Sequence, residues 1–207
     1  SKQCEEARRS LLGDTIDLRQ YKKFVGYFGH LYAGRGVEII QGIAMKNPDY
    51  AFVVYGGNEN DINKYITSNN LSNLFFMGHI NPNFVHSAMG MMDVLLMPYQ
   101  IKVSIGLEGV NTAKWMSPMK MFEYMSVGVP IISSDLPVLR EILVNGDNSI
   151  LVEADSVDDW SSALKNILAN PLLAKKIGDN AYLQYKAKHT WSIRAKNIIN
   201  LCNDNAI

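Results

Sequence analysis

The chain has 207 residues, 47% of them hydrophobic, so it is long enough to bury a substantial core. Twenty basic residues balance twenty acidic ones, which excludes a net field that would draw the whole protein onto nucleic acid. No apolar run approaches the roughly 20 residues of a membrane-spanning helix. Cys4 and Cys202 lack metal-ligand spacing and no leader-like segment is present, so we expect reduced thiols and a cytoplasmic location.

Short apolar runs alternate with segments of helical periodicity along most of the chain. The predicted strands are 24–28, 51–55, 74–77, 93–97, 130–133 and 149–152. The predicted helices are 36–46, 61–69, 83–92, 117–127, 136–143, 156–168, 171–188 and 190–201. Strands that are apolar throughout are buried on both faces. The pattern therefore predicts an α/β fold, a doubly wound, mostly parallel, six-stranded Rossmann-like sheet with extra C-terminal helices.

Three domain segments follow from this pattern. Residues 1–22 are highly charged and predict a linker or a peripheral helix, whereas residues 23–189 form the Rossmann-like domain and residues 190–207 a C-terminal helix. Ser156 and Thr190 are predicted to be the N-caps of the helices that begin there. Residues 99–115 show no periodicity and follow the fourth strand, at the end of the sheet where ligands bind in open α/β folds.

The segment Ser117–Gly128 carries the most chemical information. Ser117 as N-cap and Pro118 at the first helical position predict a helix start, whose free N–H groups and positive dipole end favour an anion. Lys120 and Glu123 are three residues apart and share a helix face. The lysine can add charge to a phosphate site, and the carboxylate can accept hydrogen bonds from a pair of hydroxyls. The alternative is an ordinary amphipathic helix with an exposed Lys–Glu pair.

The glycine-rich turn after the first strand is a second candidate. Gly29, Gly34 and Gly36 allow a close approach of the backbone to a ligand, and Arg35 at a helix opening suits a diphosphate. The spacing is not GxGxxG, which disfavours a dinucleotide cofactor. The alternative for Arg35 is a solvated residue at a helix start.

Six segments agree in order and in spacing with a known family: GHLYAGRG at 29–36, VYGG at 54–57, FMGHI at 76–80, DVLLMP at 93–98, SPMKMFEYMSVGVP at 117–130 and SDLPVLRE at 134–141. From about Val25 to Ile199 the chain resembles the C-terminal, nucleotide-sugar donor-binding domain of family 4 glycosyltransferases. The resemblance implies a GT-B enzyme of polysaccharide biosynthesis that transfers a hexosyl group with retention of configuration.

The resemblance also implies what lies outside this chain. An acceptor domain would precede Ser1, the last helix would pack towards it, and the isolated chain would be inactive. The acceptor would be a glycan or a lipid-linked glycan, and the full-length protein could associate peripherally with the inner membrane face. Nucleic acid is not an expected partner.

Single residues take roles from the same resemblance. Arg35 matches a lysine that binds the diphosphate, and His30 stands in place of the family's arginine. Glu123 matches the second of two glutamates and would bind the ribose, whereas Trp115 replaces the first. The expected donor-binding residues are Gly29, His30, Gly34, Arg35, Gly36, Gly78, His79, Ile80, Ser117, Pro118, Met119, Lys120 and Glu123, of which Arg35, Lys120 and Glu123 are also expected to be catalytic.

No cofactor or metal is expected beside the nucleotide-diphosphate sugar. The sequence contains no Asp-x-Asp, and two cations with a helix dipole can neutralise a leaving diphosphate. A nucleotide-sugar epimerase would use the same phosphate features, and a non-catalytic nucleotide-binding module is a further alternative because of Trp115. A nicotinamide-dependent oxidoreductase is disfavoured by the glycine spacing.

Overall fold

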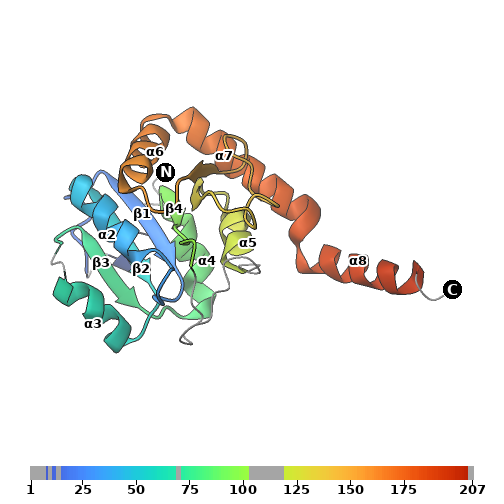
Figure 1. Cartoon of the computed structure of the whole chain (residues 1–207), viewed down its shortest axis with the longest axis horizontal. Helices are drawn as coiled ribbons and strands as arrows, with labels where there is room; N and C mark the ends of the chain where they lie inside the picture. The colour runs from blue at the N-terminus through green and yellow to red at the C-terminus, as the bar shows by residue number, and fades with distance from the viewer. Residues whose placement is uncertain (1–7, 9–10, 13–14, 69–70, 103–118, 205–207) are drawn as a thin grey trace.

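A parallel sheet lies at the centre of the computed structural model, which describes residues 8, 11–12, 15–68, 71–102 and 119–204 (Figure 1). In these residues the sheet has six strands in the order β3-β2-β1-β4-β5-β6. The strands are β1 (Lys23–Phe28), β2 (Tyr50–Tyr55), β3 (Leu74–Gly78), β4 (Val94–Met97), β5 (Ile131–Ser134) and β6 (Ile150–Val152). This confirms the predicted doubly wound α/β fold.

The central strands are buried on both faces, as their unbroken apolar runs predicted. Every residue of β4 and of β5 is buried, and β1 is buried from Phe24 onwards. Alternate strand residues face two separate clusters of the core. Helices must therefore cover both faces of the sheet.

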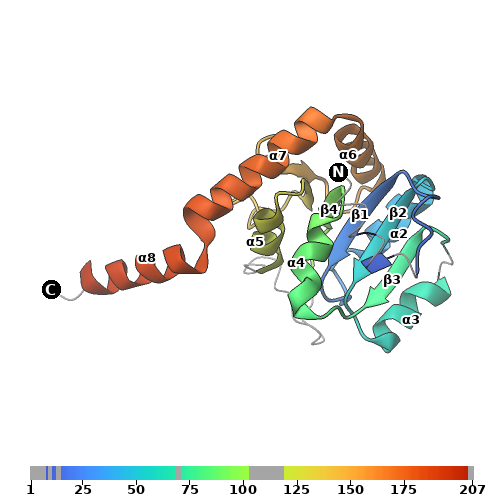
Figure 2. The same ribbon diagram turned by 180° about the vertical axis from the view of Figure 1, so that it is seen from behind.

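The helices form a layer on each face of the sheet. On one face α2 (Val37–Lys46), α3 (Glu59–Ser68) and α6 (Val157–Ala169) pack on one core cluster. On the other, α4 (Pro82–Gly90) and α5 (Met119–Val127) pack on the second cluster, and Figure 2 shows this face. α7 (Pro171–Gln184) runs beside α5 and α6 and closes the domain.

A side-chain cap stands at the start of α4, of α6, of α7 and of the helix that follows Thr190. The Ser156 hydroxyl accepts a hydrogen bond from the Asp159 amide at 3.3 Å, and the Thr190 hydroxyl accepts one from the Ile193 amide at 3.4 Å, which confirms both predicted caps. Asn81 and Asn170 do the same before Pro82 and Pro171, with bonds of 3.0 and 3.1 Å; these two caps were not predicted.

Residues 136–143 were predicted as a helix and are a series of turns, so that prediction was wrong. Backbone hydrogen bonds that span three residues alternate there with bonds that span four. The Leu139 amide donates to the Leu136 carbonyl at 2.9 Å, three residues back, and the Leu143 amide donates to the Leu139 carbonyl at 2.8 Å, four residues back. An α-helix requires consecutive backbone hydrogen bonds that each span four residues, and this short segment does not form such a series. The apolar spacing that indicated a helix instead buries Leu139 and Leu143 in the core.

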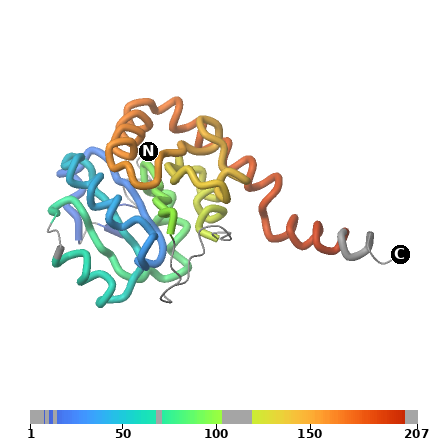
Figure 3. The backbone as a smooth tube through the Cα atoms, viewed as in Figure 1, coloured from blue at the N-terminus to red at the C-terminus, as the bar shows by residue number. Residues whose placement is uncertain are grey.

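The last helix, α8 (Trp191–Asp204), leaves the domain as an arm, as the tube in Figure 3 shows. The predicted helix 171–188 is continuous but changes geometry, because α7 passes at Tyr185 into a π-helical turn, η1 (Tyr185–His189), before α8 begins. Trp191 is 66% exposed, and Ile198 and Ile199 are 60% and 57% exposed. None of the helices that the structure describes is long and apolar enough to cross a bilayer.

The N-terminal residues contribute to the core. Leu12 and Ile16, from the segment predicted as a linker or peripheral helix, are fully buried in the same cluster as α4 and α5. Arg8 binds the Asp93 carboxylate at 2.7 Å at the amino end of β4. This segment is therefore anchored to the sheet at the described residues.

Candidate functional site

The carboxyl ends of β1, β2 and β3 are joined through the backbone. The Gly29 amide donates to the Tyr55 carbonyl at 2.9 Å, and the Gly56 amide donates to the Gly78 carbonyl at 2.6 Å. A Cβ on Gly56 would lie 2.0 Å from the Gly29 carbonyl oxygen, so only glycine permits this approach. Two of the predicted donor-binding glycines, Gly29 and Gly78, thus lie at one edge of the sheet.

The turn after β1 is held against the residues after β4. Gly36 has a φ of 80°, and a Cβ there would lie 1.9 Å from the Pro98 carbonyl oxygen. The Gln100 amide donates to the Gly34 carbonyl at 2.9 Å. This packing places Arg35 next to Tyr99, sixty-four residues further along the chain.

Arg35 is half-buried and only partly bonded. Its Nη1 donates to the Tyr99 hydroxyl at 2.9 Å, and its guanidinium carbon lies 5.1 Å from the centre of the Tyr99 ring. Its Nε is buried without a hydrogen-bond partner in the described part of the chain. A buried N–H without a partner costs free energy, so this donor is available for a ligand oxygen.

Lys120 is buried, with only 9% of its surface exposed. Its Nζ lies 3.8 Å from the centre of the Tyr27 ring and 5.0 Å from that of Tyr99. A Cβ added to Gly29 would lie 3.0 Å from the same Nζ, so the ammonium stands beside the backbone of the β1 turn. The alternative of an exposed Lys–Glu pair on an ordinary helix is therefore wrong for Lys120.

Burial dominates the electrostatics of Lys120. Loss of solvation lowers the pKa of Lys120 well below its ordinary value, the Arg35 guanidinium lowers it further, and Glu123 opposes both. Within the described residues, none of the ion pairs involves Lys120 or Arg35. Two cations thus lie together without a carboxylate at ion-pair distance in the described residues, which is the electrostatic arrangement of an anion site.

Glu123 lies one turn further along α5 and is exposed. It lies on α5 with Lys120, and its negative charge raises the pKa of Lys120. Its carboxylate is in no ion pair with any residue that the structure describes. It is therefore accessible to the hydroxyls of a ligand held at Lys120.

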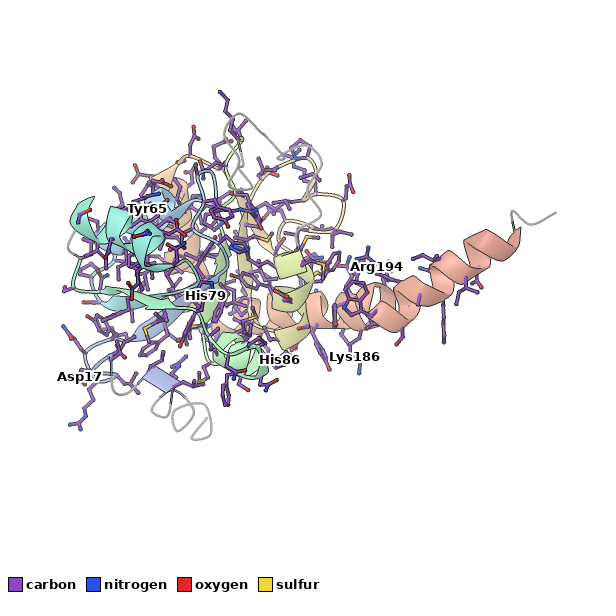
Figure 4. The ribbon with its side chains drawn as sticks, turned by 90° about the horizontal axis from the view of Figure 1, so that it is seen from below. Asp17, Tyr65, His79, His86, Lys186 and Arg194 are labelled. Carbon is purple, nitrogen blue, oxygen red and sulfur yellow. The ribbon has the colours of Figure 1, made fainter. Side chains whose placement is uncertain are left out.

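The remaining predicted residues lie less centrally or outside the description. His30 is exposed and stacks on Tyr32, with 4.9 Å between ring centres. His79 is exposed and Ile80 half-buried in the loop after β3, where Figure 4 labels His79. Met119 is 49% exposed at the start of α5. Trp115, Ser117 and Pro118 lie outside the described residues, and with them the predicted N-cap.

Two charged residues of the segments that match the family, Asp93 and Arg140, have structural roles. Asp93 accepts a hydrogen bond from the Phe24 amide at 2.9 Å at the amino end of the sheet, away from Arg35. Arg140 pairs with Asp135, its Nη2 2.6 Å from a carboxylate oxygen, and the pair is exposed.

Sequence reasoning missed the tyrosines of this site. Tyr27 and Tyr99 are buried, and both face Lys120. Tyr99 directly follows Pro98 at the end of the fourth predicted strand, and this position was the one available signal. Among the described residues, no three His, Cys, Asp or Glu side chains gather as ligands for a metal ion.

Comparison with known proteins gives consistent matches. Residues 16–184 match the family described as Glycosyl transferases group 1. The uncharacterized glycosyltransferase MJ1178 of Methanocaldococcus jannaschii is 26% identical over 170 residues, which cover 81% of this chain and 43% of that protein. The matched part of this chain therefore spans less than half the length of that relative.

Solved structures share the fold. Sucrose-phosphate synthase from Thermosynechococcus elongatus superposes with a TM-score of 0.78 at 20% identity, over 97% of this chain and 48% of that one. Anabaena Alr3699/HepE in complex with UDP-glucose superposes with a TM-score of 0.76 at 16% identity, over 98% and 53%. The family match covers most of the chain and the structures agree with it, so the chain belongs to the glycosyl transferases of group 1.

Proposed function

We propose that this chain is the donor-binding half of a retaining, family 4 hexosyltransferase and binds a nucleotide-diphosphate sugar at the carboxyl edge of its sheet. The observation that carries the proposal is the pair of cations Arg35 and Lys120, one of them buried, without a carboxylate partner in the described residues. A diphosphate supplies the missing negative charge. The complex of Alr3699/HepE with UDP-glucose supports a donor of this class.

The two cations would act most strongly as the sugar leaves. In glycosyl transfer the anomeric carbon gains oxocarbenium character while negative charge accumulates on the departing diphosphate. Arg35 and Lys120 would stabilise that charge at the moment it develops, in a site that excludes much of the water. We propose that they do so without a metal ion. Glu123 would accept hydrogen bonds from the ribose hydroxyls and fix the nucleoside.

The acceptor side lies beyond this chain in the proposal. Because the chain matches 43% of its relative's length, a second domain is expected to hold a glycan or lipid-linked glycan acceptor. The exposed Trp191, Ile198 and Ile199 of α8 provide an apolar face that such a domain could cover. The isolated chain would then bind nucleotide and transfer little sugar.

The role of Glu123 is tested by binding of nucleoside diphosphates. UDP, GDP and ADP are compared in a thermal-shift panel, because a ligand that binds only the folded state raises Tm. Glu123→Ala should weaken the best of the three about tenfold, since hydrogen bonds to a charged group are lost, and should leave inorganic diphosphate unaffected. Glu59→Ala, an exposed glutamate of α3, is the matched control. Equal loss of affinity for both ligands would show that Glu123 does not bind the ribose.

A further inference from the structure

Three tyrosine rings surround the buried ammonium of Lys120. The centres of the rings of Tyr27, Tyr99 and Tyr124 lie 3.8, 5.0 and 6.0 Å from Nζ. Aromatic faces carry negative charge density and attract a cation without accepting its protons in strong hydrogen bonds. The rings therefore stabilise the ammonium without taking up its N–H groups in strong hydrogen bonds.

Tyr99 differs from the other two rings because it contacts both cations. Its hydroxyl accepts the bond from Arg35 Nη1 at 2.9 Å, and the Arg35 guanidinium lies over its ring at 5.1 Å. Two neighbouring cations repel each other, and burial strengthens the repulsion because the local dielectric is low. A single residue that attracts both can offset this repulsion.

The position of Tyr99 is itself well determined. The side chain is only 2% exposed. The amide of the next residue, Gln100, binds the Gly34 carbonyl at 2.9 Å, and the Gln100 side chain donates to the carbonyls of Pro98 and Ala154 at 3.0 and 2.9 Å. Hydrogen bonds of Gln100 thus fix the backbone next to Tyr99. The fixed ring in turn limits the movement of the Arg35 and Lys120 side chains that it contacts.

We propose that Tyr99 is a positioning residue that holds Arg35 and Lys120 side by side, with their charges free for a diphosphate. This inference rests on the proposed function of the site and identifies the residue that prepares it. A carboxylate in the same place would hold the cations equally well but would neutralise them. The aromatic ring and neutral hydroxyl avoid that loss of charge.

The arrangement couples nucleotide binding to a proton. Among the described residues, the groups that face Lys120 are the rings of Tyr27, Tyr99 and Tyr124, the guanidinium of Arg35 and the carboxylate of Glu123. Burial and Arg35 lower the pKa of Lys120, and a bound diphosphate would raise it again. Affinity should therefore fall as pH rises through the pKa of the free site, and above it binding should take up a proton.

Two substitutions separate the hydroxyl from the ring. Tyr99→Phe removes only the acceptor of the Arg35 bond, whereas Tyr99→Leu also removes the ring from both cations. Tyr21→Phe is the matched control, because it removes a hydroxyl that donates to the Ser72 carbonyl at 2.7 Å, at a buried site without contact to the cations. Circular dichroism first establishes that each variant is folded.

The experiment is calorimetric titration with UDP, GDP and ADP between about pH 7.5 and 9.5, where phosphate groups with a second pKa near 6 no longer titrate. Buffers of different ionisation enthalpy report the protons taken up. Tyr99→Phe should weaken the best ligand about fivefold with an unchanged pH profile. Tyr99→Leu should weaken it about fiftyfold and move the fall in affinity to lower pH, because the ammonium loses the stabilising ring.

Each result decides one of the two proposals. A folded Tyr99→Leu variant that binds within twofold of the wild type, or that loses affinity with the wild-type pH profile, would overturn the positioning role. That outcome would leave the proposed function standing, because the wild type still binds nucleotide. If the wild type binds none of the three nucleotides, the proposed function fails and the role of Tyr99 fails with it.

Discussion

The two ends of the sheet treat positive charge in opposite ways. At the amino end, Arg8 and Lys23 meet the Asp93 carboxylate at 2.7 and 3.2 Å. At the carboxyl end, Arg35 and Lys120 have no carboxylate within ion-pair distance among the described residues. In each place the charged residues come from segments that are far apart in the chain. Only the positive charges at the amino end are neutralised by a carboxylate.

This difference separates a structural cluster from a functional one. A paired carboxylate secures the fold, because its partners are satisfied before any ligand arrives. Unpaired buried cations lower stability, and proteins retain such groups chiefly at sites where function requires them. This difference between the two ends can be tested by substitutions that change the packing of the carboxyl end, its charge, or the charge of the amino end.

The largest effect is expected from packing. Gly36→Ala would place a Cβ 1.9 Å from the Pro98 carbonyl oxygen at a φ of 80°, so it should destabilise the fold by at least about 4 kcal/mol and separate Arg35 from Tyr99. Urea unfolding measures the change. Gly146→Ala is the control, since its φ is 75° and its surroundings are open; strain alone should cost about 1 kcal/mol. Similar losses in both variants would contradict the close packing of the turn.

Removing the charge of Lys120 should have effects of opposite sign on binding and on stability. Lys120→Met should weaken nucleoside diphosphate binding about a hundredfold, because a charge-assisted contact is lost. It should also stabilise the free protein by about 1 kcal/mol or more, as replacement of buried charges by apolar residues often does.

The pH dependence of the Lys120→Met effect has a definite sign. Since the folded-state pKa of Lys120 is lowered, the stabilisation should be fully present below that pKa and should shrink as pH rises towards the ordinary pKa of lysine. Above that value the side chain is neutral in both states. Thermal unfolding of both proteins across alkaline pH measures this stabilisation. A variant less stable than the wild type at neutral pH would contradict the inference that the charge of Lys120 is uncompensated in the free protein.

The smallest effect is expected at the amino end. Asp93→Asn should destabilise the fold by about 2 kcal/mol, because Arg8 and Lys23 lose their partner in a partly exposed setting, and nucleotide affinity should not change. Asp49→Asn breaks the exposed pair with Lys22 and should cost under about 0.5 kcal/mol. Urea unfolding and titration are compared for both. A loss of affinity in Asp93→Asn would mean that the two ends are not independent.

Much of the fold could be predicted because the strands are marked locally. Buried parallel strands are continuous apolar runs, so each predicted boundary lies within one residue of the observed one. Residues 136–143 were misassigned because helical spacing of apolar residues also suits turns that are fixed to a core. The spacing of Leu139 and Leu143 does not distinguish the two.

The candidate site could be predicted only in part. Arg35 and Lys120 follow from motifs, but their proximity depends on how the turn after β1 packs on the residues after β4. No local signal pairs Arg35 with Tyr99, sixty-four positions away. The burial of Lys120 is likewise a tertiary property, since three rings from separate elements enclose it.

The strand order has a consequence for how the site comes into being during folding. β1, β2 and β3 are consecutive in the chain and neighbours in the sheet, as are β4, β5 and β6, and the contact of β1 with β4 joins the two groups. Arg35 belongs to the first group and Lys120 to the second. Each group can form its own ladder from near neighbours in sequence, but neither contains both cations. A ligand that requires both therefore recognises only molecules in which β1 and β4 have paired.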